Sequence, residues 1–289
     1  MDMATQVSSP MPQVFPPGGD ALSGANWIGT IARDARDLYR FRAVLKNLVA
    51  QDFRLRYHRS VLGFLWTLLN PILMMAVLSV VFSQFFKFDN AGNYAIYLFS
   101  GLVPWSMLYA TVSEGAICVI ANEPLIRKIY IPKLVFPITR VLLNAATLVL
   151  SMGALFLLMV PLGARLTAPL LLLPLAITLF ATFALGIALI TATVNTFYRD
   201  FGHLLTVVLQ AWYFATPIIY PVNTLPPEVA WRFWLNPAYP FIRFFQTIIH
   251  DGQWPSWALV CSSAGIAAVV LGIGYVTFKC YEDKLVFRL

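Results

Sequence analysis

Long apolar stretches without charged residues recur along this 289-residue chain, separated by short polar gaps. A helix needs about 20 apolar residues to cross roughly 30 Å of hydrocarbon, and six stretches are long enough. They lack the polar–apolar alternation of barrel strands, so only helices would satisfy their backbone groups in lipid. The pattern predicts an all-α integral membrane protein whose six transmembrane helices cover about residues 61–86, 94–112, 141–162, 169–194, 201–220 and 255–278.

Composition agrees with this interpretation and excludes a soluble protein. Hydrophobic residues make up 59% of the chain and charged residues 11%, well outside the range of soluble domains. A soluble protein of this size needs a charged exterior, and the chain has too few charges to build one.

The net charge of +7 is better explained by membrane topology than by nucleic-acid binding. Sixteen of the 20 Lys and Arg residues lie before the first predicted span, between the second and third, between the fourth and fifth, or after the sixth. The other four, Lys87, Arg165, Arg232 and Arg243, lie in the alternate gaps. Because basic residues stay on the cytoplasmic side during insertion, both termini are expected in the cytoplasm, with no nucleic-acid partner.

Two segments precede the first span. Residues 1–26 are rich in Pro, Gly and Ser and contain no basic residue, so we expect a disordered cytoplasmic tail. Residues 27–58 carry an apolar stripe at helical spacing between basic residues, which predicts an amphipathic helix at the cytoplasmic interface. The alternative is a helix that docks on its own domain. The stripe consists of Leu38, Phe41, Leu45, Leu48 and Val49.

Three residues inside the predicted spans are candidates for lining a conduit. Asn70 precedes Pro71 in the first span, and this pair either kinks the helix for packing or lines a path. Trp105 and Tyr109, four residues apart, share one helical face. Aromatic faces inside a membrane usually pack, but sugars also stack on such rings, so both interpretations stay open.

The segment Ala121–Ile131 (ANEPLIRKIYI) predicts a short cytoplasmic helix. Pro124 suits a helix start, and the order of an acidic residue first and basic residues last suits the helix dipole. Its apolar stripe, Leu125, Ile126 and Ile129, would need a protein partner to be buried.

The segment Pro221–Trp254 on the predicted outer side is too apolar for a solvated loop, yet five prolines break it too often for a spanning helix. Short re-entrant helices that dip into the membrane explain it better, since such backbone is tolerated only where protein buries it or where it lines a cavity.

The chain lacks the residues of common catalytic sites. No lysine follows a glycine, so a Walker A phosphate loop is absent, and the H-E-x-x-H and G-x-S-x-G patterns are absent too. None of the 13 acidic residues lies in a predicted span, which disfavours coupling to protons or ions. The three scattered cysteines support neither a disulfide nor a metal site. Energy for any transport must therefore come from another protein.

Three motifs resemble one family. Residues 52–71 (DFRLRYHRSVLGFLWTLLNP), residues 122–137 (NEPLIRKIYIPKLVFP) and the turn Tyr198-Arg199-Asp200 are similar to motifs of the ABC-2-type permeases that export polysaccharides, such as O-antigen and teichoic acid. The likeness covers the chain from about Lys46 to the C-terminus. One departure is Gln51, at a position where this family often has arginine.

The resemblance implies a homodimer of six-span subunits in the cytoplasmic (inner) membrane, each joined to a separate ATP-binding subunit. Two permeases and two ATPases would then move a polyprenyl-linked glycan through membrane lipid, with ATP and Mg bound only by the partner subunit. Three candidate sites follow. The coupling helix would comprise Glu123, Pro124, Leu125, Ile126, Arg127 and Lys128. The N-terminal interface, near the point where the lipid pyrophosphate enters, would comprise Arg54, Arg56, Tyr57 and Arg59. The outer gate would comprise Pro217, Tyr220, Trp231, Trp234, Tyr239 and Phe244.

Two other functions compete with polysaccharide export. One is an ABC-2 exporter of teichoic acid, another lipid or a drug. The other is a membrane-embedded enzyme of glycan assembly, which would act without an ATPase.

Overall fold

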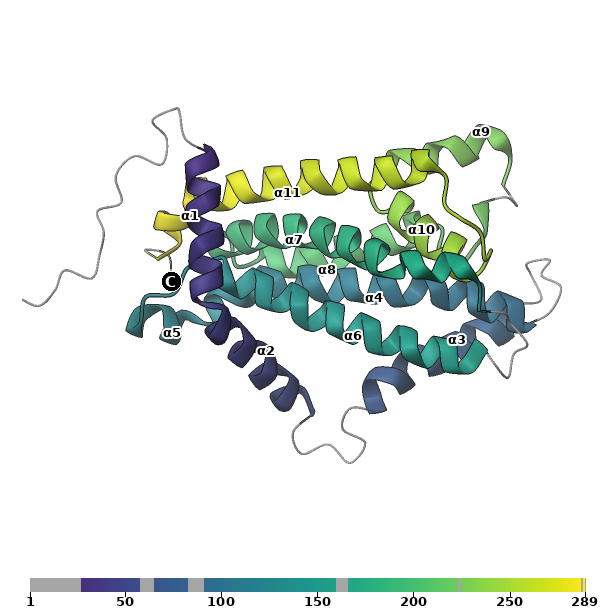
Figure 1. The fold of residues 1–289 in the computed structure, drawn as a ribbon, viewed down its shortest axis with the longest axis horizontal. Coiled ribbons are helices and arrows are strands. Elements are labelled where there is room, and N and C mark those ends of the chain that lie inside the picture. Colours follow the sequence, from purple (N-terminus) through teal and green to yellow (C-terminus); the bar gives the residue numbers. More distant parts are fainter. Residues whose placement is uncertain are drawn as a thin grey trace, which may run out of the picture.

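The computed structural model describes residues 27–57, 65–82, 91–159, 166–222, 225–286 and 288. Within these ranges every regular element is a helix and none is a strand. The expected tail, residues 1–26, lies outside the described residues, as do Arg59 and Arg165. The long helices run side by side in one bundle (Figure 1).

The N-terminal segment forms α1 (Trp27–Arg40) and α2 (Arg42–Tyr57). Figure 1 shows α1 lying across one end of the bundle, where α5 and the end of α11 also lie. The apolar stripe of these helices packs against the bundle itself, as the docking alternative expected, through Leu38, Phe41, Leu45 and Leu48. Asp34 adds polar contacts, because it accepts hydrogen bonds from the Tyr275 hydroxyl (2.6 Å) and the Lys279 ammonium (3.0 Å) on α11.

Helix α4 (Ala91–Ala121) lies at the centre of the fold and contacts α3 (Leu65–Phe82), α6 (Val135–Met159), α7 (Leu173–Phe197) and α10. Its 31 residues would extend about 46 Å at 1.5 Å per residue, beyond a hydrocarbon core of about 30 Å. The helix continues to Ala121, past residue 112, where the second predicted span ends, and Glu114 lies on this extension.

Helix α7 follows the short 3-10 helix η1 (Ala168–Leu172) and packs most extensively against α11 (Trp257–Val286). Two glycines face each other in this contact. A Cβ atom added to Gly274 would lie 2.2 Å from the carbonyl oxygen of Gly186. Small residues permit such close approach of membrane helices.

Four helical stretches among the described residues are long and apolar enough to cross a membrane: Asn93–Lys128, Val135–Leu157, Ala168–Phe197 and Trp257–Leu285. They correspond to the second, third, fourth and sixth predicted spans. The helix at the fifth predicted span (residues 201–220) is shorter than expected, because α8 (Phe201–Ala215) ends before Thr216-Pro217. The apolar helix α3 lies at the first predicted span.

The remaining elements are short. Helix α5 (Glu123–Lys128) follows α4, whereas α9 (Pro227–Ala230), η3 (Trp231–Leu235) and α10 (Tyr239–Ile249) follow α8 at the opposite end of the bundle. Every residue of α10 except Arg243 is buried. The α10 part of the segment 221–254 is thus packed into the protein, whereas Trp231, Trp234, Leu235 and Trp254 are exposed.

Candidate functional site

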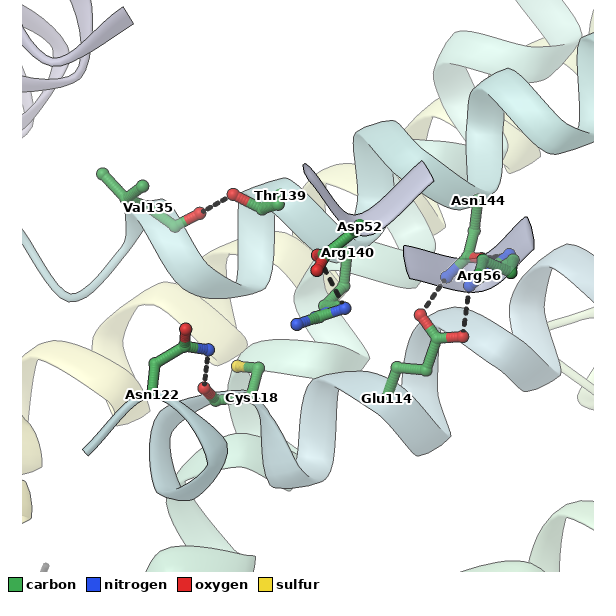
Figure 2. A network of polar contacts seen from close by, with 9 residues as sticks. All are labelled: Asp52, Arg56, Glu114, Cys118, Asn122, Val135, Thr139, Arg140 and Asn144. Atoms are coloured by element: carbon green, nitrogen blue, oxygen red, sulfur yellow. Dashed lines mark hydrogen bonds and ion pairs between the residues drawn. The ribbon is translucent and has the colours of Figure 1, made fainter. Parts of the chain in front are cut away.

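A network of charged and polar side chains joins α2 to α4 and α6 (Figure 2). The Arg56 guanidinium donates to a Glu114 carboxylate oxygen at 2.6 Å. Asn144 lies between them: its amide nitrogen donates to the other Glu114 oxygen at 3.1 Å, and its oxygen lies 3.4 Å from both terminal nitrogens of Arg56. This network connects three helices that lie far apart in the sequence.

A second ion pair lies one helical turn away. Arg140 on α6 contacts Asp52 on α2 at 2.8 Å, with side chains 19% and 20% exposed. Residues four apart share a helical face, so Asp52 and Arg56 point from α2 toward Arg140 and Asn144 on α6. The two pairs have opposite polarity, which fixes the register of α2 on its neighbours.

The N-terminal candidate residues are only partly described. Arg56 is paired as above, Arg54 is exposed, and the Tyr57 side chain lies outside the described residues, as does Arg59. Sequence reasoning missed Glu114 and Asn144 as partners. The available signal was the spacing of Asp52 and Arg56, which matches that of Arg140 and Asn144, but spacing alone does not say which helices meet.

The short helix expected within Ala121–Ile131 is present as α5. Glu123 and Arg127 form an ion pair at 2.8 Å along its exposed side, with Pro124 in the first turn and Lys128 exposed. Leu125 and Ile126 are half-buried against an apolar cluster of the chain itself. Ile129 and the neighbouring Tyr130 are 53% and 55% exposed. The surface available to a partner is therefore the charged face together with these last two side chains.

The cluster beneath α5 is shared with the N-terminal helices. Its buried members lie at the α5 end of the bundle, and Leu45 and Leu48 of α2 pack on it together with Leu125 and Ile126. We call it the α5-end cluster; its buried members are Cys118, Val119, Ile131, Leu134, Val135, Phe136, Leu189, Ala192, Phe278 and Leu285.

Of the conduit candidates, Trp105 is buried, with 4% of its surface exposed. Its ring contacts those of Trp212 and Tyr213 on α8, at centroid distances of 5.7 and 5.8 Å. The packing alternative accounts for Trp105. Tyr109 is half-buried against the same core, and the Asn70 side chain lies outside the described residues.

Side chains from distant helices satisfy the backbone where α8 stops. The Tyr97 hydroxyl donates to the Tyr220 carbonyl at 2.9 Å, and the Gln246 amide donates to the Pro217 carbonyl at 3.2 Å. A buried carbonyl without a partner is costly. These contacts let an irregular chain lie inside an apolar bundle.

Asn236 also supplies hydrogen bonds to the chain where α8 ends. Its oxygen accepts from the Trp212 indole at 2.8 Å and from the Ala238 backbone N–H at 3.0 Å. Its amide nitrogen donates to the Thr216 hydroxyl at 2.9 Å and to the Ala215 carbonyl. One side chain thus fixes the end of α8 to the start of α10.

The six outer-gate candidates do not form one cluster of exposed rings. Pro217, Tyr239 and Phe244 are buried and Tyr220 is half-buried, whereas Trp231 and Trp234 are 57% and 49% exposed. The buried members position the segment, and only the two tryptophans offer large exposed rings.

The end of α10 carries a separate ion pair. Asp251 contacts Arg243 at 2.9 Å and His250 at 2.8 Å. Burial raises the pKa of the Asp251 carboxyl, but the hydrogen bond with His250 and the charge of Arg243 outweigh burial and lower the pKa below its ordinary value.

Comparison with known proteins agrees with this architecture. The sequence profile described as "ABC-2 type transporter" matches residues 43–250. The chain is 32% identical over 254 residues to an O-antigen export system permease protein RfbA of Myxococcus xanthus, covering 87% of this chain and 97% of that protein. It is 25% identical to the protein of that name in Klebsiella pneumoniae (74% and 82% covered) and 22% identical to the polysialic acid transport protein KpsM of Escherichia coli (84% and 95%). From its motifs, its helices and these relatives, the chain belongs to the ABC-2 type transporter family.

Proposed function

We propose that this chain is the permease subunit of an ATP-driven ABC exporter that moves lipid-linked polysaccharide across the cytoplasmic membrane. The observation that carries the proposal is the 32% identity over almost the whole length of a protein named as an O-antigen export permease. The relatives named for polysialic acid and capsule polysaccharide transport support a polysaccharide over a drug. The chain is a transport subunit and not an enzyme, and a separate subunit hydrolyses ATP.

The proposed topology has six spans with both termini in the cytoplasm. The four long apolar stretches would supply the second, third, fourth and sixth spans, and α3 and α8 would supply the first and fifth spans. The start of α1, helix α5 and the end of α11 lie at one end of the bundle, as a shared cytoplasmic side requires. The position of α1 across that end suits a helix in the membrane interface.

At the cytoplasmic end, α5 would act as the coupling helix that docks on the ATPase. Its charged residues Glu123, Arg127 and Lys128 and the exposed Ile129 provide a mixed surface. Because α5 and α2 pack on the same α5-end cluster, movement of α5 would be transmitted to α2. Two copies of the permease with two ATPases would form the complete exporter.

At the opposite end, the broken segment from Thr216 to Ile249 would form the re-entrant outer gate. Burial of α10 and the side-chain hydrogen bonds to the carbonyls of Pro217 and Tyr220 support this placement. The exposed rings of Trp231 and Trp234 would meet the glycan or the second copy.

Deletion of the gene and recovery of lipid-linked glycan test the proposal. Loss of the permease is expected to trap completed polyprenyl-linked polysaccharide inside the cell and to remove it from the surface. Normal surface polysaccharide together with drug sensitivity would instead favour a drug exporter, and sugar transfer by the purified chain alone would favour an enzyme.

The coupling helix is tested by Glu123→Arg. The Glu123–Arg127 pair is exposed, so its loss costs only about 0.5 kcal/mol of stability. Folded permease should therefore remain, while co-purification with the ATPase falls. The double variant Glu123→Arg/Arg127→Glu is the matched control, since it restores the pair within α5 and should still bind the ATPase poorly.

A further inference from the structure

The two ion pairs of α2 differ in construction. Asp52 and Arg140 form a plain pair that is about one-fifth exposed. The side chains of Arg56 and Glu114 are 29% and 30% exposed. A third side chain, that of Asn144, takes part in this second pair. Within the part of the chain that the structure describes, only the second pair therefore has a polar neighbour that stays behind if one partner moves.

Asn144 gives Glu114 a partner that does not depend on Arg56. Its amide nitrogen lies 3.1 Å from Glu114, whereas its oxygen lies 3.4 Å from the Arg56 nitrogens, beyond the usual length of a good hydrogen bond. A half-buried carboxylate that loses its cation is costly unless other donors remain. Glu114 keeps one donor, so the departure of Arg56 is less costly than the departure of Arg140 from Asp52.

Arg56 also lies close to the end of its helix, with 29% of its side chain exposed to an incoming ligand. It is the penultimate residue of α2, and Glu114 lies seven residues before the end of α4, about 10 Å at the helical rise. A guanidinium binds carboxylate and phosphate with the same planar fork. Phosphate is therefore a direct competitor of Glu114 for Arg56.

We propose that Arg56 and Glu114 form an exchange latch, in which a phosphate-bearing headgroup of the lipid-linked substrate replaces Glu114 as the partner of Arg56. The exchange frees the end of α2 from α4 and α6, while Asp52 and Arg140 keep the preceding turn attached. Glu114 stays hydrogen-bonded to Asn144 until Arg56 returns. This inference rests on the proposed function, because the anion is the headgroup of the exported glycan lipid.

Charge reversal of each pair separates a latch from a structural tie. Each single reversal should reduce the amount of assembled exporter. Arg56→Glu/Glu114→Arg and Asp52→Arg/Arg140→Asp should both restore assembly, measured by co-purification with the ATPase. Only Asp52→Arg/Arg140→Asp should also restore surface polysaccharide, to within about twofold of the original. In the Arg56/Glu114 double variant, export should stay at least tenfold lower, because the cation is now held on α4. Equal export by both double variants would overturn the latch.

A binding measurement keeps the proposal falsifiable if a double variant does not assemble. The purified permease–ATPase complex in nanodiscs is titrated with polyprenyl pyrophosphate or, separately, with inorganic pyrophosphate. Glu114→Gln removes the competing charge and keeps the shape, so polyprenyl pyrophosphate should bind at least fivefold more tightly. Asp52→Asn is the control and should bind as the original does. Unchanged or weaker binding by Glu114→Gln would refute the exchange, as would inorganic pyrophosphate that binds as tightly as the lipid.

Failure of the latch is distinguishable from failure of the proposed function. If deletion of the gene leaves surface polysaccharide normal, the substrate assignment is wrong. If deletion removes the polysaccharide, the original gene restores it and the Arg56/Glu114 double variant restores it equally, only the latch is wrong.

Discussion

Replacement of Gly274 by alanine tests the close contact between α7 and α11 at Gly186. The new Cβ would lie 2.2 Å from the Gly186 carbonyl oxygen and 2.9 Å from its carbon. Ordinary contact begins at 3.4 Å, so α7 and α11 must separate by about 1.2 Å there. A gap of 0.5–1 Å already forfeits about a quarter to a half of the dispersion attraction between facing atoms.

The expected cost follows from the rigidity of the contact. Overpacking costs about 1–3 kcal/mol where side chains can rearrange, and here the obstacle is backbone, which cannot rotate away. We therefore expect Gly274→Ala to lower the free energy of unfolding by about 3 kcal/mol. That change shifts the ratio of folded to unfolded permease by about a hundredfold.

The assay is unfolding of the purified permease in mixed detergent micelles with rising SDS, followed by circular dichroism. Gly272→Ala is the matched control. Gly272 lies on the same helix as Gly274, and a Cβ added there would meet nothing within 4 Å outside that helix's own backbone. Alanine is the better helix former, so this control should be unchanged or up to about 1 kcal/mol more stable. Equal midpoints for the two variants would refute the proposed packing of α7 on α11.

Three further predictions concern other sites. Trp105→Ala should cost about 3–5 kcal/mol of stability, because its ring packs against Trp212 and Tyr213; stable folded protein with impaired export would instead indicate a lining residue. Asn236→Asp keeps the two acceptor contacts but loses the donors to Thr216 and Ala215, and should lower the unfolding free energy by about 1–3 kcal/mol; an unchanged SDS midpoint would contradict this. The lowered pKa of Asp251 stabilises the folded state above the unfolded pKa of about 3.9, and this contribution is lost as the pH falls through the folded pKa. The protection of residues 249–256 against hydrogen exchange, corrected for the intrinsic rate at each pH, should therefore fall with acid more in the original protein than in Asp251→Asn, and identical acid dependence would exclude this role for Asp251.

Periodicity and charge placed the helices with fair accuracy. Four of the predicted spans overlap the four long apolar stretches of the described bundle, and Pro124 with its flanking charges predicted α5. These features are local, because helix formation and membrane partition depend on residues within a few turns of one another. Charge alone placed the second predicted span at residues 94–112, whereas α4 continues to Ala121, because burial between neighbouring helices accommodates the added turns.

The pairing of the functional residues could not be predicted in the same way. Arg56 looked like a free cation for pyrophosphate, and the fold gives it Glu114, 58 positions away. Likewise Tyr97 reaches the carbonyl of Tyr220 across 123 positions. Such contacts depend on which helices pack against each other. The periodicity of a sequence predicts which face of a helix is apolar, but it does not predict which other helix packs on that face.

By itself, the sequence determined that this chain is a helical membrane protein, and it located the short charged helix α5. Only the tertiary structure decided that α4 is the central helix, that two ion pairs of opposite polarity tie α2 to α4 and to α6, and that side chains satisfy the backbone at the interrupted end of α8. The physical reason is that membrane partition and helix formation depend on the hydrophobicity and helix propensity of residues close together in the sequence. Charge pairing and carbonyl satisfaction arise between segments that meet only after the helices have packed.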